Sequence, residues 1–340
     1  MTLARTPALD PRGIHAEVAR AVQDTVIRLC PGVSAIAGYH AGWLTEEGAP
    51  AVGGLGKALR SRLAVLGGAA AGASTGMCVA AGVAVEFVHD FSLLQDDVMD
   101  GDTERRHRPA AWTVFGAPAA LLTSDALLAA AAEVLLEADS PHAACATRVL
   151  LKTVRALVLG QTRDLAFEQR LDVTPEEYLA MAAGKTAALI SCSASLGAVL
   201  AGAPTEVVMG LAEYGTNLGL AFQLTDDLLG IWGDAQLTGK PVLADLRRRK
   251  KSAPVVAALN SGGLHALELR DFYEDPGPLS ETDVPRMALL VEQCHGRRWT
   301  IDRIALHTAE ALRCLSGLRL PQDVAAELAE IAQSVPSRRK

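Results

Sequence analysis

Three carboxylates stand close together in the run SLLQDDVMD, directly behind an apolar stretch of the chain. Asp96 and Asp100 are four residues apart, so in a helix they share one face at a separation of roughly 6 Å along the axis. Asp97 flanks this pair. Unpaired carboxylates at this spacing repel each other and need cations. Oxygen ligands of this kind favour Mg²⁺, which completes its shell with water and substrate phosphates.

A second acidic pair, Asp226 and Asp227, ends another apolar stretch in the run GLAFQLTDD. If either run stood alone, an acidic helix end at the protein surface would explain it as well as a metal site would. Two acidic helix ends that face each other would hold metal ions between them, which suits diphosphate chemistry. The repetition therefore favours a metal site over two solvated helix ends.

A diphosphate site also needs Lys or Arg side chains. Each basic group of the chain, taken alone, is explained by a solvated surface. The net charge of −7 speaks against nucleic acid as a partner, and the run RRRKK is too short to reverse that view. The basic candidates are Lys57, Arg60, Arg62, Arg105, Arg106, Arg108, Lys185, Lys240 and the run 247–251.

The composition indicates the elements that must position these groups. Half of the 340 residues are apolar and only 4% are aromatic, with Ala and Leu dominant. This predicts an all-α fold with a large helical core in a single domain. The domain is expected over residues 12–335, with disordered tails at 1–11 and 336–340 and a surface linker at 260–283. Helical periodicity predicts helices at 14–29, 57–66, 77–99, 118–136, 141–171, 174–200 and 205–229.

Residues 63–85 carry no charge and are long enough to raise the question of a transmembrane segment. Their apolarity comes mostly from Ala and Gly, with GGAAAGASTG in the middle, so two buried helices joined by a tight turn are expected instead. The opening MTLARTPALDPRG lacks the apolar region of a signal peptide. The six cysteines contain no CxxC pair. Together these features predict a cytoplasmic protein with reduced thiols and no transmembrane segment.

Six motifs, in order, resemble those of the trans-isoprenyl diphosphate synthases, also called the polyprenyl synthetase family. The likeness is closest to a bacterial branch that often makes geranylgeranyl diphosphate. It extends by motif from about residue 54 to residue 254. The motifs are GLGKALRSRL, VEFVHDFSLLQDDVMDGDTERR, SDALL, GQTRD, GKT, and FQLTDD followed by GKP and RRRKKS.

The resemblance implies a site for each part of a two-substrate reaction. It implies that isopentenyl diphosphate binds Lys57, Arg60, His89 and Arg106. It implies that three Mg²⁺ ions per site bind Asp96, Asp97, Asp100, Asp226 and Asp227. The allylic diphosphate would contact Arg105, Lys185 and Thr186, with Gln223, Lys240 and Lys250 aligned to the same site. The residues expected to carry catalysis are Asp96, Asp97, Asp100, Asp226 and Lys185.

The implied activity is a head-to-tail prenyl transfer. An allylic diphosphate ionises, and isopentenyl diphosphate attacks the cation to give geranylgeranyl or farnesyl diphosphate. The implied fold is the isoprenoid synthase type, a single-domain bundle of roughly ten or more helices around a central cavity. Relatives are mostly homodimers. Phe91 and Ser92, about one helical turn before Asp96, match the positions that set product length in relatives.

One departure from the family pattern leaves alternatives open. Gly230 stands where many relatives have a third Asp, and Asp234 is a possible substitute. A class I terpene cyclase would need no second diphosphate site, so Lys57, Arg60 and His89 speak against it. A non-catalytic partner subunit would have lost both acidic runs, whereas here the first is intact.

Overall fold

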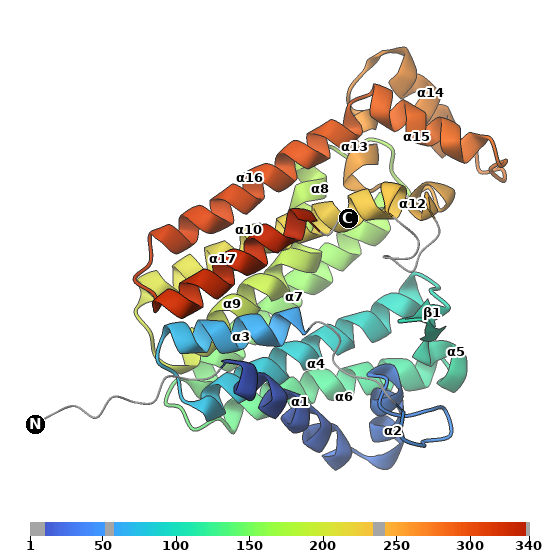
Figure 1. The fold of residues 1–340 in the computed structure, drawn as a ribbon. Helices are drawn as coiled ribbons and strands as arrows, with labels where there is room; N and C mark the ends of the chain where they lie inside the picture. Colours follow the sequence, from blue (N-terminus) through green and yellow to red (C-terminus); the bar gives the residue numbers. More distant parts are fainter. Residues whose placement is uncertain (1–10, 52–57, 234–241, 338–340) are drawn as a thin grey trace, which may run out of the picture. The chain divides into compact units, whose positions relative to one another are not determined.

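The computed structural model describes residues 11–51, 58–233 and 242–337. These residues fold almost entirely into helices (Figure 1). Within the described ranges the only sheet is a two-stranded hairpin of β1 (Glu104–Arg105) and β2 (Arg108–Pro109). The helices of the first half are α1 (Pro11–Arg28), α2 (Pro31–His40), α3 (Leu59–Ala70), α4 (Thr75–Met99), α5 (Ala111–Phe115), α6 (Ala117–Leu136) and α7 (Ala143–Phe167).

The helices of the second half follow without a strand between them. They are α8 (Pro175–Ala182), the π-helix η1 (Ala183–Ala187), α9 (Ala188–Leu200), α10 (Thr205–Trp232), α12 (Ala244–Arg247), α13 (Ala253–Leu259), α14 (Gly263–Glu274), α15 (Asp283–Gln293), α16 (Gly296–Ser316) and α17 (Gln322–Ser337). The seven helices expected from periodicity are all present. The expected helix at 174–200 consists of α8, η1 and α9 in direct succession.

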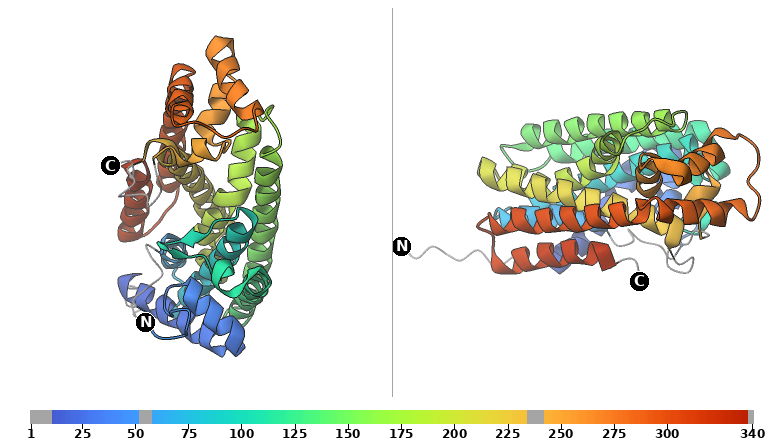
Figure 2. Two further views of the ribbon diagram at one scale, coloured as in Figure 1. Left: turned by 90° about the vertical axis from the view of Figure 1, so that its right-hand side faces the viewer. Right: turned by 90° about the horizontal axis from the view of Figure 1, so that it is seen from above.

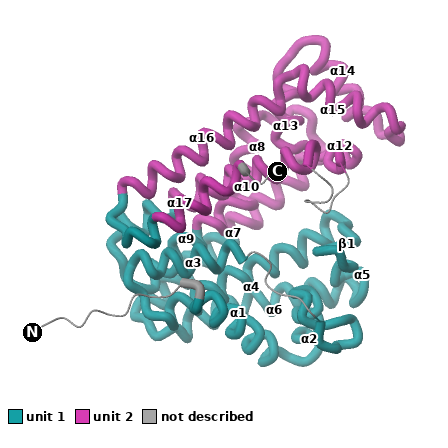
Figure 3. Tube along the Cα trace, in the orientation of Figure 1, with its two compact units in different colours: residues 1–154, 192–212, 318–325 teal, residues 155–191, 213–317, 326–340 magenta. Residues whose placement is uncertain are grey.

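The chain divides into two compact units (Figure 3). Unit 1 holds Met1–Val154, Cys192–Ala212 and Leu318–Ala325, and unit 2 holds Arg155–Ser191, Glu213–Gly317 and Ala326–Lys340. Both units are therefore discontinuous in sequence, and the division falls inside α7, α9, α10 and α17. The single domain expected over 12–335 stays a prediction.

In unit 1 the long helix α4 packs against α1, α3 and α6. Small residues permit these close contacts. A Cβ atom at Gly82 of α4 would stand 2.8 Å from a methyl carbon of Val18 in α1. The turn between α3 and α4 uses Gly72 at φ +71°, and Ser74 caps α4 by accepting a hydrogen bond from the Met77 N–H. The apolar stretch 63–85 thus forms two largely buried helices joined by a tight turn, as predicted.

In unit 2 the helices α12 to α15 share an apolar core that includes Leu246, Val255 and Met287. The helices α14 and α15 lie side by side as a hairpin (Figure 2). The expected surface linker at 260–283 is wrong, because α14 occupies residues 263–274. Its buried residues Ala266, Leu269 and Tyr273 recur at spacings of three and four, a helical pattern hidden among polar and turn-forming residues.

Three helical stretches have the length and apolarity to cross a membrane, by those two criteria alone. They are Thr75–Met99, Ala117–Leu136 and Pro175–Leu200. In the most apolar window of the first, 78% of the residues are buried inside the protein, compared with 39% for α6. Packing within the protein therefore explains the apolarity of α4, whereas much of α6 faces outward.

Candidate active site

The first acidic run lies at the C-terminal end of α4, in unit 1. Asp96 is half-buried, and Asp100 forms the C-cap, where its N–H donates to the Asp96 carbonyl oxygen at 2.8 Å. The C-terminal end of a helix carries partial negative charge, so carboxylates are unfavourable there. Their placement therefore costs stability, which is typical of groups that serve to bind a cation.

Asp97 differs from its two neighbours because it is buried against a basic side chain. Its Oδ1 accepts a hydrogen bond from Arg105 Nε at 2.9 Å and a second, short one from Arg105 Nη2. Burial raises the pKa of Asp97, and Arg105 acts against this rise. Within the described part of the chain, Asp97 Oδ2 is buried and has no hydrogen-bond partner. Only one Asp97 oxygen is therefore left for a metal ion in this conformation.

The short hairpin β1–β2 presents three arginines to three different partners. Arg106 and His107 form its turn with φ of +55° and +61°. Arg108 is held in place by the carbonyl oxygens of Tyr39 (3.3 Å) and Leu44 (2.8 Å), and its guanidinium lies 4.3 Å from the centre of the Tyr39 ring. Arg108 therefore anchors the hairpin, while Arg105 and Arg106 point toward the carboxylates of α4.

Arg106 lies over a buried group of ionisable side chains. Its Nη2 is 3.9 Å from Asp90 Oδ1, and His40 Nε2 is 3.7 Å from the same oxygen. Burial, with a further contribution from Glu86, raises the pKa of Asp90 to about 7. Burial lowers the pKa of His40 to about 3 and also lowers that of His89. Both histidines are therefore neutral at physiological pH.

Arg60, at the start of α3, contributes to this electrostatic environment. Its charge is a secondary cause of the low pKa of His89, which places the two side chains near one another. Arg60, His89 and Arg106, three of the residues predicted to bind isopentenyl diphosphate, are therefore in electrostatic contact within unit 1. Lys57, the fourth, lies outside the described residues.

In unit 2, Lys185 and Thr186 lie in the π-helix η1. A π-helix is a single wide turn that often marks a functional site. This turn fits closely against α7, because a Cβ atom at Gly160 would stand 2.1 Å from the Lys185 nitrogen. Lys185 Nζ donates to Asp164 Oδ2 at 2.6 Å. The motifs GQTRD and GKT are thus packed together, and Asp164 supplies the carboxylate that pairs with Lys185.

The second acidic pair, in α10, consists of one exposed carboxylate and one buried carboxylate whose two oxygens both accept hydrogen bonds. Asp227 is buried, and its Oδ1 accepts a hydrogen bond from Gln223 Nε2 at 3.0 Å. Its Oδ2 accepts from the Ala253 N–H at 2.7 Å and from the Tyr178 hydroxyl in a short bond. Asp226, by contrast, is exposed. Both Asp227 oxygens thus accept hydrogen bonds inside the protein, and the role of Asp227 as a metal ligand stays a prediction.

Gln223 connects this network to the π-helix. Its Oε1 accepts a hydrogen bond from the Thr186 hydroxyl at 2.5 Å while its amide nitrogen donates to Asp227. Lys250 is exposed, and its charge acts on Asp227. Of the residues that the resemblance places at the allylic diphosphate, Gln223 therefore bonds Asp227 directly and Thr186 bonds Gln223. Lys240 and Asp234 lie outside the described residues.

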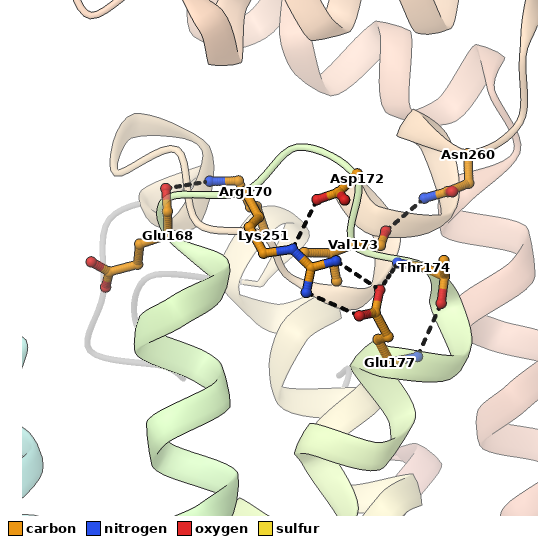
Figure 4. Close-up of polar contacts among 8 residues, drawn as sticks. All are labelled: Glu168, Arg170, Asp172, Val173, Thr174, Glu177, Lys251 and Asn260. Atoms are coloured by element: carbon orange, nitrogen blue, oxygen red, sulfur yellow. Dashed lines mark hydrogen bonds and ion pairs between the residues drawn. The ribbon is translucent and has the colours of Figure 1, made fainter.

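Polar contacts hold the loop between α7 and α8 and the start of α8 (Figure 4). Thr174 and Glu177 form a reciprocal capping box at the start of α8. Arg170 bonds Glu177 through two nitrogens, at 2.9 and 3.2 Å. The loop is also bonded from elsewhere in unit 2, because Lys251 donates to the Glu168 carbonyl oxygen and Asn260 to that of Val173. These contacts set the register of α8 and hence the position of the Tyr178 hydroxyl.

The described residues contain no ready-made metal cage: no group of three or more His, Cys, Asp or Glu is placed to hold an ion. Mg²⁺ does not require one, since it binds one or two carboxylates together with substrate phosphates and water. Asp96, Asp100 and Asp226 offer such oxygens, and Asp97 has one buried oxygen without a hydrogen-bond partner. The donor set fits Mg²⁺ delivered with a diphosphate, and not a permanent structural ion.

Known proteins resemble this chain over most of its length. The family model for polyprenyl synthetase matches residues 42–288. The chain belongs to the polyprenyl synthetase family. A (2E,6E)-farnesyl diphosphate synthase of Mycobacterium tuberculosis is 42% identical over 327 residues, which cover 95% of this chain and 91% of that protein. A geranylgeranyl diphosphate synthase of the same organism is 45% identical over 265 residues, covering 78% and 76%.

Solved structures of the family share this fold. A polyprenyl synthetase from Streptomyces coelicolor is 43% identical, with a TM-score of 0.90 over 96% of this chain and 99% of that one. A polyprenyl synthase from Caulobacter crescentus, in complex with calcium and isoprenyl diphosphate, is 30% identical, with a TM-score of 0.84 over 97% and 96%. These findings confirm the predicted family and the all-α isoprenoid synthase fold.

Proposed function

We propose that this chain is a prenyltransferase that condenses isopentenyl diphosphate head-to-tail with an allylic diphosphate to give a short-chain prenyl diphosphate. Its membership of the polyprenyl synthetase family carries this proposal, since the match includes both acidic runs and the three implied basic residues between them, Arg105, Arg106 and Lys185. Farnesyl or geranylgeranyl diphosphate is the product, because relatives that cover most of the chain bear those names.

Mg²⁺ fits the oxygens available at the two acidic helix ends. In unit 1, Asp96 and Asp100 of α4 would hold the metal with the second oxygen of Asp97, and in unit 2 Asp226 of α10 would be a ligand. When bound with the diphosphate, the metal neutralises the leaving group and so promotes ionisation of the allylic substrate. The buried Asp227 holds Gln223, Tyr178 and the start of α13 in place.

The basic residues divide between two diphosphates. Arg60, His89 and Arg106, with Lys57, bind isopentenyl diphosphate and aim its double bond at the allylic carbon. His89 acts as a neutral hydrogen-bonding group, since its pKa is lowered by burial. The allylic diphosphate is bound by Lys185, Thr186, Gln223, Lys240 and Lys250, and by Arg105 once it turns away from Asp97. Catalysis then depends on position and electrostatics, with no side-chain nucleophile.

Three further features complete the proposal. Phe91 is buried in α4 and Ser92 bonds the His89 carbonyl oxygen, so the two define the space one turn before Asp96. The outward face of α6 and α7 carries exposed apolar side chains, which suits a homodimer. All six cysteines are unpaired, which suits the reducing cytoplasm.

Product analysis tests the proposal. Purified protein is incubated with Mg²⁺, isopentenyl diphosphate and, in turn, dimethylallyl, geranyl and farnesyl diphosphate, and the products are identified by mass spectrometry. Linear prenyl diphosphates are expected. Cyclic hydrocarbons from one substrate would indicate a terpene cyclase, and no product in any reaction would indicate a non-catalytic partner subunit.

The variant Asp96→Ala tests the metal assignment. Because it removes a proposed ligand from a partly exposed helix end, we expect turnover to fall by at least a hundredfold while the melting temperature stays within a few degrees of wild type. The exposed Asp125→Ala substitution on α6 is the matched control and should leave turnover unchanged. Full turnover in Asp96→Ala would refute the assignment.

A further inference from the structure

Two buried acidic residues, Glu86 and Asp90, lie one helical turn apart on the same face of α4. Each carboxylate contacts a different neighbouring segment of unit 1. Glu86 Oε1 accepts a hydrogen bond from the Ser61 N–H of α3 at 2.9 Å, directly after Arg60. Asp90 Oδ1 is 3.9 Å from Nη2 of Arg106 in the hairpin turn. The two carboxylates therefore contact the two segments that carry Arg60 and Arg106.

The hairpin and α2 are bonded to each other, and both reach the Asp90 carboxylate. Arg108 donates to the Tyr39 carbonyl oxygen at 3.3 Å, and the next residue, His40, has its Nε2 3.7 Å from Asp90 Oδ1. This Nε2 atom is buried and has no hydrogen-bond partner in the described part of the chain. Because burial lowers the pKa of His40 to about 3, its ring is neutral. Arg106 is therefore the charged partner of Asp90.

The ionisable groups that face Asp90 come from four elements of unit 1. Glu86 of α4 adds to the rise that burial causes in the pKa of Asp90, while Arg106 of the hairpin and Arg60 of α3 oppose that rise. His40 of α2 is the fourth group. Among the described residues, α1, α5 and α6 also pack against α4 but contribute none of the charges that shift this pKa. The resulting pKa is about 7, so the Asp90 charge changes near neutral pH.

Arg106 has a second predicted partner, the diphosphate of isopentenyl diphosphate. The Arg106 side chain is 38% exposed and that of Asp90 only 10%, so a ligand reaches the guanidinium more readily than the carboxylate. An ionised Asp90 cancels part of the Arg106 charge and places a negative charge near the bound anion. A protonated Asp90 does neither. The protonated form is therefore the one that favours an anion at Arg106.

We propose that Asp90 is a positioning residue for isopentenyl diphosphate: through Arg106 it sets the affinity for this substrate, and it takes up a proton when the diphosphate binds. The proton comes from the solvent, and the diphosphate replaces the carboxylate as the charged partner of Arg106. This inference rests on the proposed function, because it needs that diphosphate at Arg106. It predicts that binding of isopentenyl diphosphate weakens as the pH rises through 7, because the unbound protein then loses the proton that the complex keeps.

Steady-state kinetics at saturating Mg²⁺ test the role of Asp90. The KM values for isopentenyl diphosphate and for geranyl diphosphate are measured from pH 6 to pH 8.5 in wild type, Asp90→Asn and Asp125→Asn. Asp90→Asn keeps the shape of the protonated residue, and Asp125, exposed on α6, provides the matched control. Comparison at each pH removes the effect of substrate ionisation, which is the same for all three proteins.

At pH 6, where Asp90 is protonated, we expect equal KM values for isopentenyl diphosphate in wild type and Asp90→Asn. At pH 8.5 the wild-type KM should be roughly three- to tenfold higher than that of Asp90→Asn, because a pKa that differs by up to one unit between free and bound protein changes affinity by up to tenfold. Asp125→Asn should follow wild type, and KM for geranyl diphosphate should be the same in wild type and Asp90→Asn. Parallel profiles for isopentenyl diphosphate would overturn the proposal. Equal changes for both substrates would also overturn it, because they would indicate a purely structural role.

Calorimetry of the wild type decides if Asp90→Asn does not fold. Isopentenyl diphosphate is titrated at pH 8 in two buffers of different ionisation enthalpy, which gives the number of protons taken up on binding. A diphosphate releases protons when it binds to cations, so net uptake identifies a group of the protein. We expect net uptake, and binding without uptake would refute the role of Asp90 alone. A wild type that binds no isopentenyl diphosphate at any pH and forms no product would refute the proposed function, and this inference with it.

Discussion

The carboxyl group of Asp90 is buried, so its ionised form is unfavourable. It is 7% exposed, next to His40 and beneath Arg106, and it also experiences the charges of Glu86 and Arg60. His40 is neutral because burial lowers its pKa to about 3. Arg106 is thus the cation nearest to the Asp90 oxygen, at 3.9 Å and on the partly exposed side. A protonated Asp90 leaves the Arg106 charge free for an anion, whereas an ionised Asp90 partly cancels it.

Asp90→Asn should change how stability depends on pH. Burial raises the pKa of Asp90 from 3.8 to about 7, so the folded protein binds a proton here that the unfolded chain has released. This contribution to stability is full below pH 4 and is lost as the pH rises toward 7. We expect wild type to lose roughly 1–3 kcal/mol of unfolding free energy through this group between pH 5 and pH 8, and Asp90→Asn to lose less. Urea unfolding at several pH values measures how the unfolding free energy of each protein depends on pH.

A neutral substitution elsewhere provides the control for Asp90. Asp125→Asn on the exposed face of α6 removes the same charge and should keep the wild-type pH profile. Parallel profiles for wild type and Asp90→Asn would contradict the assignment of this pH dependence to Asp90.

Phe91 is the residue expected to limit the length of the product. It is buried in α4 about one turn before Asp96. Phe91→Ala removes most of a large side chain and leaves a cavity, so a longer prenyl chain should fit. We expect the product distribution, measured by mass spectrometry, to shift by at least one five-carbon unit. Ser92→Ala, which removes only a hydroxyl, should shift it little, and an unchanged distribution in Phe91→Ala would contradict the role.

At the level of elements, the contact of the π-helix η1 with α7 is the most sensitive point of unit 2. A Cβ atom at Gly160 would meet the Lys185 backbone at 2.1 Å, and one at Gly184 would meet the Ala156 carbonyl oxygen at 2.9 Å. Backbone atoms cannot move aside as a flexible side chain does. The two glycines therefore determine how near Lys185 comes to Asp164.

Gly160→Ala should force η1 away from α7. We expect a loss of about 2–4 kcal/mol in unfolding free energy, because overpacking against backbone is costly. The KM for the allylic diphosphate should also rise, since Lys185 moves with η1. Gly32→Ala in α2 is the matched control, because nothing lies within 4 Å of its Cβ position, and its stability should stay within about 1 kcal/mol of wild type. Equal stability of the two variants would contradict the packing argument.

Elements with a strong apolar period were predictable from the sequence, and elements defined by contacts were not. The long helices α4, α7 and α10 appear where periodicity placed them. The helix α14 was missed because Gly262 and Gly263 and the polar residues around it indicate a linker. The π-helix was unpredictable because it depends on close packing against Gly160 and not on local propensity.

The same distinction holds for the candidate site. Spacing indicated Asp96, Asp100 and Asp226, because carboxylates at helix ends are visible in the sequence. It could not separate Asp226 from Asp227, since only the structure gives Asp227 its contacts with Tyr178 and Ala253.

At the scale of the whole molecule, the unburied apolar side chains bear on assembly. Only 39% of the residues in the most apolar window of α6 are buried, although its mean hydropathy of 1.7 exceeds that of α4. Leu122 and Leu136 on α6 are 66% and 57% exposed, and α7 adds Leu151, Val158 and Leu159 at spacings of seven and one. Exposed apolar side chains on each of these helices favour burial against a second copy of the chain.

The wild-type protein should therefore sediment as a dimer at micromolar concentration, and Leu122→Lys should shift it toward monomer. A lysine at the centre of an apolar interface would place an unpaired charge there, which costs several kcal/mol and raises the dissociation constant by at least a hundredfold. Leu264→Lys is the matched control, since Leu264 is 82% exposed on α14 and lies outside the proposed interface. Analytical ultracentrifugation distinguishes the outcomes: a dimeric Leu122→Lys, or a monomeric wild type, would show that the α6 and α7 face serves another purpose.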